Sequence, residues 1–279
     1  GGWWVKAPAF EYMRPTTVSE AAGLLAASDG DARILSGGQS LVPMMNLRLA
    51  YPSALIDIAR IAELATIDDR SETVLVGAAV THARLEDGAA GDHWNGFLAH
   101  VAREIAYRGV RNRGTIGGSI AHADPAADWP VALAALGAAV EIAGPSARRS
   151  VAAEDFVLGM FETGLEPDEL VVGVTIPKLS RNARWSYFKI RRKAGAFADA
   201  LAAVVVDRER GTARVAVGGV ATGLRRIDTL ECCLLDGADQ ATTGDRIEAA
   251  LAAINPDMDA FHSRLHKVSL SRALQEALT

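Results

Sequence analysis

Two short glycine-rich segments constrain this chain of 279 residues more than any other feature. They run from Ser36 to Ser40 and from Gly114 to Ser119, and each combines two paired glycines with flanking hydroxyl residues. Backbone N–H groups without side chains in the way can converge on one oxyanion, and two such loops suit the two charges of a pyrophosphate. The other interpretation is a pair of ordinary tight turns, and the loops alone leave that alternative open.

The common nucleotide-binding fingerprints are missing from the sequence. No Gly-x-Gly-x-x-Gly follows a predicted strand and opens a helix, and no Gly-Lys-Ser or Gly-Lys-Thr occurs. A dinucleotide that binds here therefore does not use a Rossmann unit.

Composition and cysteine usage exclude several classes of function. A formal charge of -5 does not suit a nucleic-acid surface, which needs clustered Lys and Arg. We expect no membrane span, because the longest apolar stretch, 130–144, is too short to cross a bilayer. We also expect no secretion leader, because no charged segment followed by an apolar one opens the sequence. The two cysteines, Cys232 and Cys233, are adjacent, and an iron–sulfur cluster takes four thiolates. We expect a cytoplasmic protein with no metal site of its own.

Hydrophobic periodicity and turn residues predict two α+β domains, of residues 5–178 and 179–279. In the first domain, the segment 111–119 has too many glycines to form a helix, and Asp128 is placed to cap the helix that follows it. The predicted helices there cover 18–27, 83–89, 97–105 and 129–136, and the predicted strands cover 33–35, 54–57, 73–79, 138–142 and 170–176.

The second domain shows a different pattern. Three strands joined by turns, over 185–190, 200–207 and 213–220, predict a three-stranded antiparallel sheet. Two helices are predicted to follow it, over 247–254 and 261–278.

Three segments together resemble the flavin-binding motifs of one family. They read ILSGGQSLVP at 34–43, RGTIGGS at 113–119 and ADPAAD at 123–128. The family contains the FAD-binding medium subunit of aerobic carbon monoxide dehydrogenase and the matching domain of xanthine dehydrogenase, both molybdenum hydroxylases. Similar likenesses at 165–170, 187–198 and 264–273 extend the resemblance over nearly the whole chain.

The resemblance implies an FAD-binding domain of the vanillyl-alcohol-oxidase (PCMH) type, followed by a smaller C-terminal domain. It places the pyrophosphate of FAD between the two glycine loops, and it implies no catalytic residue and no metal ligand. The cofactor-binding residues carried over are Leu35, Ser36, Gly37, Gly38, Gln39, Ser40, Leu41, Ile105, Thr115, Ile116, Gly117, Gly118, Ser119, His122, Asp128, Leu170, Lys189 and Phe197.

Some of these residues carry specific expectations. By resemblance, His122 and Asp128 lie along the sugar and linker hydroxyls of FAD, and Phe197 covers one face of the isoalloxazine ring. Residue by residue, alternatives stay open: Asp128 as a simple helix cap, Phe197 as ordinary core and His122 as a structural histidine. Gln39 stands where many relatives in the wider fold have a histidine that bonds to the flavin, so we expect noncovalent FAD. Ala196 replaces a common acidic residue, which puts a polar contact there in doubt.

The resemblance also implies a role in a larger assembly. This chain would pass electrons from the [2Fe–2S] clusters of a small partner subunit to an external acceptor, while a large partner subunit holds molybdopterin. A dimer of such heterotrimers is implied. Two alternatives remain at this point: a free-standing FAD-dependent oxidase or dehydrogenase of the same fold, and a scaffold subunit that has lost its flavin.

Overall fold

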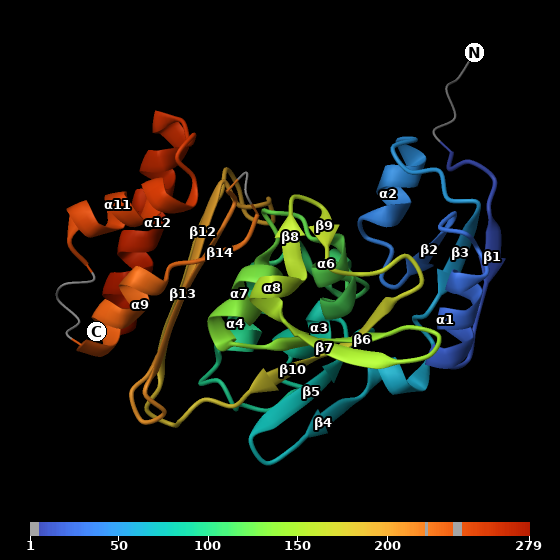
Figure 1. Cartoon of the computed structure of the whole chain (residues 1–279), viewed down its shortest axis with the longest axis horizontal. Helices are drawn as coiled ribbons and strands as arrows, with labels where there is room; N and C mark the ends of the chain where they lie inside the picture. The colour runs from blue at the N-terminus through green and yellow to red at the C-terminus, as the bar shows by residue number, and fades with distance from the viewer. Residues whose placement is uncertain (1–5, 221–222, 237–241) are drawn as a thin grey trace.

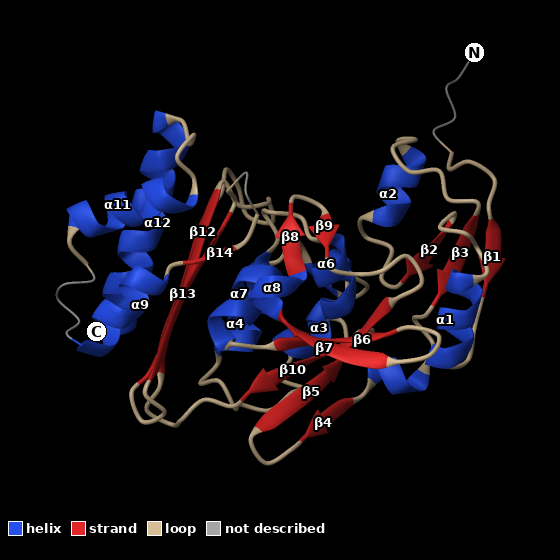
Figure 2. Cartoon of the chain, viewed as in Figure 1, coloured by secondary structure: helices blue, strands red, loops and turns tan. Residues whose placement is uncertain are grey.

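A computed structural model describes residues 6–220, 223–236 and 242–279 of the chain. Besides a two-stranded hairpin, three sheets of three or more strands follow one another along the sequence, and Figure 1 shows them side by side from the blue N-terminal part to the orange and red C-terminal part. Helices lie against all three sheets (Figure 2), so the chain is of the α+β class. Residue 5, at which the first predicted domain starts, lies outside the described residues.

The first sheet is small and parallel, with strand order β1-β3-β2. Helix α1 packs on it, and Thr17 caps this helix by accepting a hydrogen bond from the Glu20 N–H at 3.1 Å. The first glycine loop joins strand β2 to helix α2. The elements are β1 (Glu11–Met13), α1 (Val18–Ala26), β2 (Ala32–Leu35), α2 (Leu41–Asn46) and β3 (Ala54–Asp57).

The second sheet has five antiparallel strands in the order β4-β5-β10-β6-β7. A layer of short helices covers it, and their apolar faces build the largest buried cluster of the molecule. The strands are β4 (Ile67–Asp69), β5 (Thr73–Gly77), β6 (Ala139–Ala143), β7 (Arg148–Ala152) and β10 (Leu170–Pro177). The helices are η1 (Ala62–Ala65), α3 (His82–Glu86), α4 (Phe97–Glu104), α5 (Arg108–Arg111), α6 (Ile116–His122), α7 (Asp128–Leu136) and α8 (Ala153–Phe156), and a small hairpin adds β8 (Val157–Gly159) and β9 (Glu162–Thr163).

The second glycine-rich segment contains a helix, so the prediction that it is not helical was wrong. Thr115 caps α6 by accepting a hydrogen bond from the Gly118 N–H at 3.1 Å. Ile116 and Ile120, four residues apart, are both fully buried and anchor one face of the helix. A cap and two anchors outweigh the low helix propensity of two glycines.

The third sheet is antiparallel, in the order β11-β12-β13-β14. The predicted three strands are present, but the count was wrong because β14 adds a fourth. This strand has only two residues, Arg225 and Arg226, too few to show an alternating pattern. The strands are β11 (Arg184–Ile190), β12 (Ala200–Asp207), β13 (Thr212–Gly218) and β14 (Arg225–Arg226), and the helices are α9 (Asp228–Asp236), α11 (Gly244–Ile254) and α12 (Ala260–Leu278).

Both faces of this third sheet are buried. Helices α9, α11 and α12 cover one face, and α7 packs on the other, where Val131 contacts strand β13 closely at Gly218. Tyr187, Leu201 and Ala203 of the sheet therefore belong to the same hydrophobic cluster as the helices of the preceding sheet. The apolar core crosses the predicted boundary at residue 178.

Two further findings concern membranes and thiols. Within the described ranges, no helix combines the length and the apolar character that a membrane crossing needs. Cys232 and Cys233 lie on α9 as free thiols, the first exposed and the second partly buried.

Candidate cofactor-binding site

One cavity of about 640 Å³ lies where the glycine loops meet the ends of β10 and β11. Every residue predicted to bind the cofactor lines this cavity, with the exception of Ile116. Ile116 is fully buried in the main hydrophobic cluster, so its side chain anchors α6 instead of facing the cavity. The lining residues that were predicted are Leu35, Ser36, Gly37, Gly38, Gln39, Ser40, Leu41, Ile105, Thr115, Gly117, Gly118, Ser119, His122, Asp128, Leu170, Lys189 and Phe197.

The two glycine loops contact each other directly. A Cβ atom at Gly37 would lie 2.2 Å from the carbonyl oxygen of Arg113, so only glycine permits this approach. The hydroxyl groups of Ser36 and Thr115 share a hydrogen bond of 2.9 Å across the same junction. Gly117 has a different role, because a Cβ there would lie 2.4 Å from the Cβ of Ala78. It lets α6 pack closely against the segment after β5.

The loops differ in the backbone donors that they leave free. Within the described residues, the main-chain N–H groups of Gly37, Gly38, Gln39 and Ser40 have no hydrogen-bond acceptor. In the second loop the corresponding groups are already bonded: Ile116 to Val80, Gly117 to Ala78, and Gly118 and Ser119 to Thr115. The first loop can therefore receive an anion with its backbone, whereas the second offers hydroxyl groups and a close approach.

Asp128 was predicted to cap α7, and this was wrong. It is the first residue of the helix, and Ala127 holds the cap position without a side-chain bond. The Asp128 Oδ1 atom instead accepts hydrogen bonds from the Tyr187 hydroxyl at 2.5 Å and from the Lys189 ammonium at 2.7 Å. The Asp128 and Lys189 side chains are only 5% and 2% exposed. Burial, followed by the negative charge of Asp128, raises the pKa of Tyr187 well above its ordinary value.

The second carboxylate oxygen of Asp128 remains available. Within the described chain, its Oδ2 atom has no hydrogen-bond partner, and the residue lines the cavity. A carboxylate in this position can accept hydrogen bonds from the hydroxyl groups of a ligand. Capping is excluded as the role of this side chain.

Other predicted residues occupy different parts of the wall. Leu170 is buried at the start of β10, and Ile105 lies at the end of α4, so both present apolar surface. Phe197 lies at the cavity with 63% of its surface exposed, which rules out the interpretation as ordinary core. His122 packs against Phe161 with ring centroids 5.1 Å apart. Gln39 is exposed, and its amide donates to the Gly37 carbonyl at 3.3 Å.

Sequence reasoning missed several lining residues, including Ala78, His82, Val110 and Phe161. These residues lie outside the recognised motifs and reach the cavity through the fold. Of these, only His82 could have been suspected from the sequence, because it is a polar residue that closely follows the predicted strand 73–79, after Val80 and Thr81.

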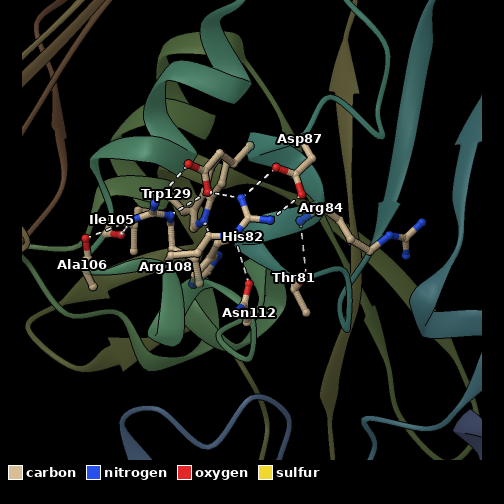
Figure 3. Close-up of polar contacts among 11 residues, drawn as sticks. Thr81, His82, Arg84, Asp87, Ile105, Ala106, Arg108, Asn112 and Trp129 are labelled. Atoms are coloured by element: carbon tan, nitrogen blue, oxygen red, sulfur yellow. Dashed lines mark hydrogen bonds and ion pairs between the residues drawn. The ribbon is translucent and has the colours of Figure 1, made fainter.

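One ion pair, with side chains 11% and 12% exposed, fixes the wall beside His82, which Figure 3 labels together with Ile105 and Ala106. The Arg111 guanidinium pairs with Glu86 at 2.7 Å and donates to the carbonyl groups of Ile105 and Ala106 at 2.9 and 3.0 Å. Ala106 has a φ of 42°, a conformation that non-glycine residues rarely adopt. Arg111 therefore holds a strained stretch of cavity wall in place.

Residues 8–179 match the model of the FAD-binding domain in molybdopterin dehydrogenases, and the chain belongs to this family. The cavity suits the family's cofactor: the first loop offers free N–H donors to a pyrophosphate, Asp128 offers an acceptor, and Ile105 and Leu170 offer an apolar wall.

Individual relatives are similar over nearly their full length. The chain is 40% identical over 256 residues to the carbon monoxide dehydrogenase medium chain of Hydrogenophaga pseudoflava, covering 90% of this chain and 89% of that one. It is 37% identical over 252 residues to the nicotine 6-hydroxylase medium subunit of Paenarthrobacter nicotinovorans, with 89% and 87% covered. The structure of reconstituted CO dehydrogenase from Oligotropha carboxidovorans superposes with a TM-score of 0.89 at 32% identity, covering 97% of this chain and 98% of that one. The resemblance stated from the sequence is confirmed.

Proposed function

We propose that this chain is the electron-transfer subunit of a molybdenum hydroxylase and holds FAD noncovalently in the cavity between its two glycine loops. The observation that carries the proposal is the convergence of nearly all the motif residues on one cavity. They come from segments as distant as Leu35 and Phe197. Tight turns alone give no reason for the two glycine loops to meet there.

Different residues of the chain would bind different parts of the cofactor. The free N–H groups of residues 37–40 would bind the pyrophosphate, and Asp128 would accept from the hydroxyl groups of the linker. Phe197 would exclude water from one face of the ring. Bound FAD supplies the capacity to accept electrons and pass them on, which no side chain here provides.

Finer features of the proposal rest on the family. We propose a fold of the PCMH type over residues 5–178, followed by a smaller C-terminal domain over 179–279. A large molybdopterin subunit and a small iron–sulfur subunit would be the partners, in a cytoplasmic dimer of heterotrimers. The description of several relatives as medium chains or medium subunits supports such an assembly. Gln39, which cannot form the histidyl bond to flavin, supports noncovalent binding.

Anaerobic flavin reduction tests the role of the chain as a relay. The isolated, FAD-loaded chain should remain oxidised when mixed with heterocycles, aldehydes or carbon monoxide, and should bleach with dithionite. Adding both partner subunits should make the bleaching depend on substrate. Bleaching of the lone chain by an organic substrate would favour a free-standing oxidase or dehydrogenase instead.

A further inference from the structure

His82 connects the second glycine loop to the buried layer of helices. It is the first residue of α3, and its backbone N–H donates to the Gly114 carbonyl at 2.9 Å. The residue is only 5% exposed. The Nδ1 atom of its imidazole ring accepts a hydrogen bond from the Trp129 indole at 2.9 Å (Figure 3). Trp129 is fully buried on α7, next to Asp128.

This hydrogen bond fixes the tautomer of the imidazole. An indole N–H can only donate, so Nδ1 of His82 carries no proton and Nε2 carries the single proton of the neutral ring. Burial, and to a smaller extent the charge of Arg111, lowers the pKa of His82 to about 3. A second proton would also set two donors against each other at Trp129. The ring is therefore neutral at ordinary pH.

The Nε2 atom opens toward the cavity. Among the described residues, fully buried side-chain nitrogen and oxygen atoms without a hydrogen-bond partner occur only in His266. His82 Nε2 also has no partner within these residues, and because it is not among the fully buried atoms, it must be accessible. His82 lines the cavity, so Nε2 is accessible from there. A Cβ atom at Gly114 would lie 2.8 Å from this nitrogen, so glycine at position 114 leaves room for the ring.

We propose that His82 is a further FAD-binding residue, which donates a hydrogen bond from Nε2–H to an acceptor atom of the cofactor beside Gly114. The inference rests on FAD occupying the cavity, as proposed above. FAD presents hydroxyl, carbonyl, ring-nitrogen and phosphate acceptors along its length. A neutral donor held by Trp129 binds such an acceptor without adding charge, in contrast to the Lys189 ammonium on the same wall.

Two variants distinguish the hydrogen bond that Nδ1 accepts from the one that Nε2 donates. In His82→Asn, the amide oxygen can still accept from Trp129, but the side chain is too short to donate from the position of Nε2. In His82→Gln, the amide N–H₂ reaches that position. We expect His82→Asn to lower the FAD affinity of the full chain by about 3- to 10-fold, the effect of one neutral hydrogen bond. His82→Gln should keep most of the affinity.

Titration of the apo-chain with FAD, followed by flavin fluorescence, provides the measurement, and thermal unfolding of each apo-variant checks the fold. His82→Leu serves as a second donor-less variant if His82→Asn fails to fold. Because the donor is neutral, the affinity ratio between wild type and donor-less variant should be the same near pH 6 and near pH 8. Equal affinities of wild type and donor-less variant, or a ratio that grows on acidification, would overturn the inference. A wild-type chain that binds no FAD would instead refute the proposed function.

Discussion

Asp128 joins the two halves of the chain through one carboxylate oxygen. Its partners Tyr187 and Lys189 both lie on β11, and the Asp128–Lys189 ion pair is almost completely buried. Removing one member of a buried ion pair leaves an uncompensated charge, which costs more than the loss of a helix cap. Asp128 therefore stabilises the fold in addition to any contact with the cofactor.

We predict that Asp128→Ala lowers the free energy of unfolding by about 3–5 kcal/mol. The double variant Asp128→Ala/Lys189→Met should recover much of this loss, because no buried charge is then unpaired. Urea denaturation of the flavin-free chain measures both values, and a double-mutant cycle isolates the coupling. Losses that simply add in the double variant would mean that the two side chains do not interact.

His82 makes the free energy of unfolding of the chain depend on pH. The unfolded chain binds a proton at this residue near its ordinary pKa of about 6.5, whereas the folded chain binds it only near a pKa of about 3. The unfolded state therefore holds more protons between these values, and the free energy of unfolding falls as the pH falls through this window.

We predict that His82→Gln makes this fall shallower, by at most ~1.4 kcal/mol per pH unit. Urea denaturation of the flavin-free chain at several pH values below about 6.5 gives the slopes. His100 and His266, whose pKa values are also lowered by burial, should keep part of the acid sensitivity in both proteins. Identical slopes for wild type and variant would show that His82 titrates normally in the folded chain.

At the scale of elements, the N-terminus of α6 is the junction between the two glycine loops. Thr115 caps the helix through Gly118 and also bonds to Ser36 of the first loop. A Cβ atom at Gly118 would lie 2.9 Å from the Thr115 hydroxyl oxygen and would disturb both bonds.

We predict that Gly118→Val loses bound flavin while the chain stays folded, with a stability cost of about 0.5–2 kcal/mol for the cap. Gly109→Val is the matched control, because it changes a glycine in the neighbouring helix α5 whose Cβ would meet nothing within 4 Å. Flavin absorbance per chain and thermal unfolding are measured for both. Full flavin occupancy in Gly118→Val would contradict the role of this junction.

Elements with a regular apolar pattern could be predicted from the sequence, and irregular ones could not. Strand β12 is a continuous apolar run, and helices α4 and α12 have apolar residues at helical spacing. Their predicted bounds agree with the structure to within one residue. Helix α6 was missed because its stability comes from tertiary burial of Ile116 and Ile120, which overrides the propensity of its glycines. Strand β14 exists only through its pairing with β13.

The residues of the site also fall into two groups, those inside the sequence motifs and those that only the fold brings to the cavity. Residues inside the motifs, such as Ser36 and Lys189, line the cavity, and their binding of the cofactor stays a prediction. Ile116 does not line it, because its position in a motif says nothing about which way its side chain points. The fold brings His82 to the cavity through its bonds to Gly114 and Trp129, which no local pattern reveals.

At the scale of the whole molecule, the third sheet depends on the preceding part of the chain. Helix α7 covers its inner face, and Asp128 at the start of that helix lies in the cavity wall and bonds to strand β11. Lys189 and Phe197, beyond residue 178, complete the wall. The cavity is therefore formed by both halves together, and a change in their packing would alter the cofactor site.

The flavin content of the purified chain tests the central claim most directly. We predict a yellow protein from which acid precipitation releases one FAD per chain into the supernatant, because Gln39 cannot hold the flavin covalently. Chromatography and mass measurement of the released flavin identify it. Flavin that stays with the precipitated protein, or a folded chain that binds no FAD when FAD is supplied, would contradict the account.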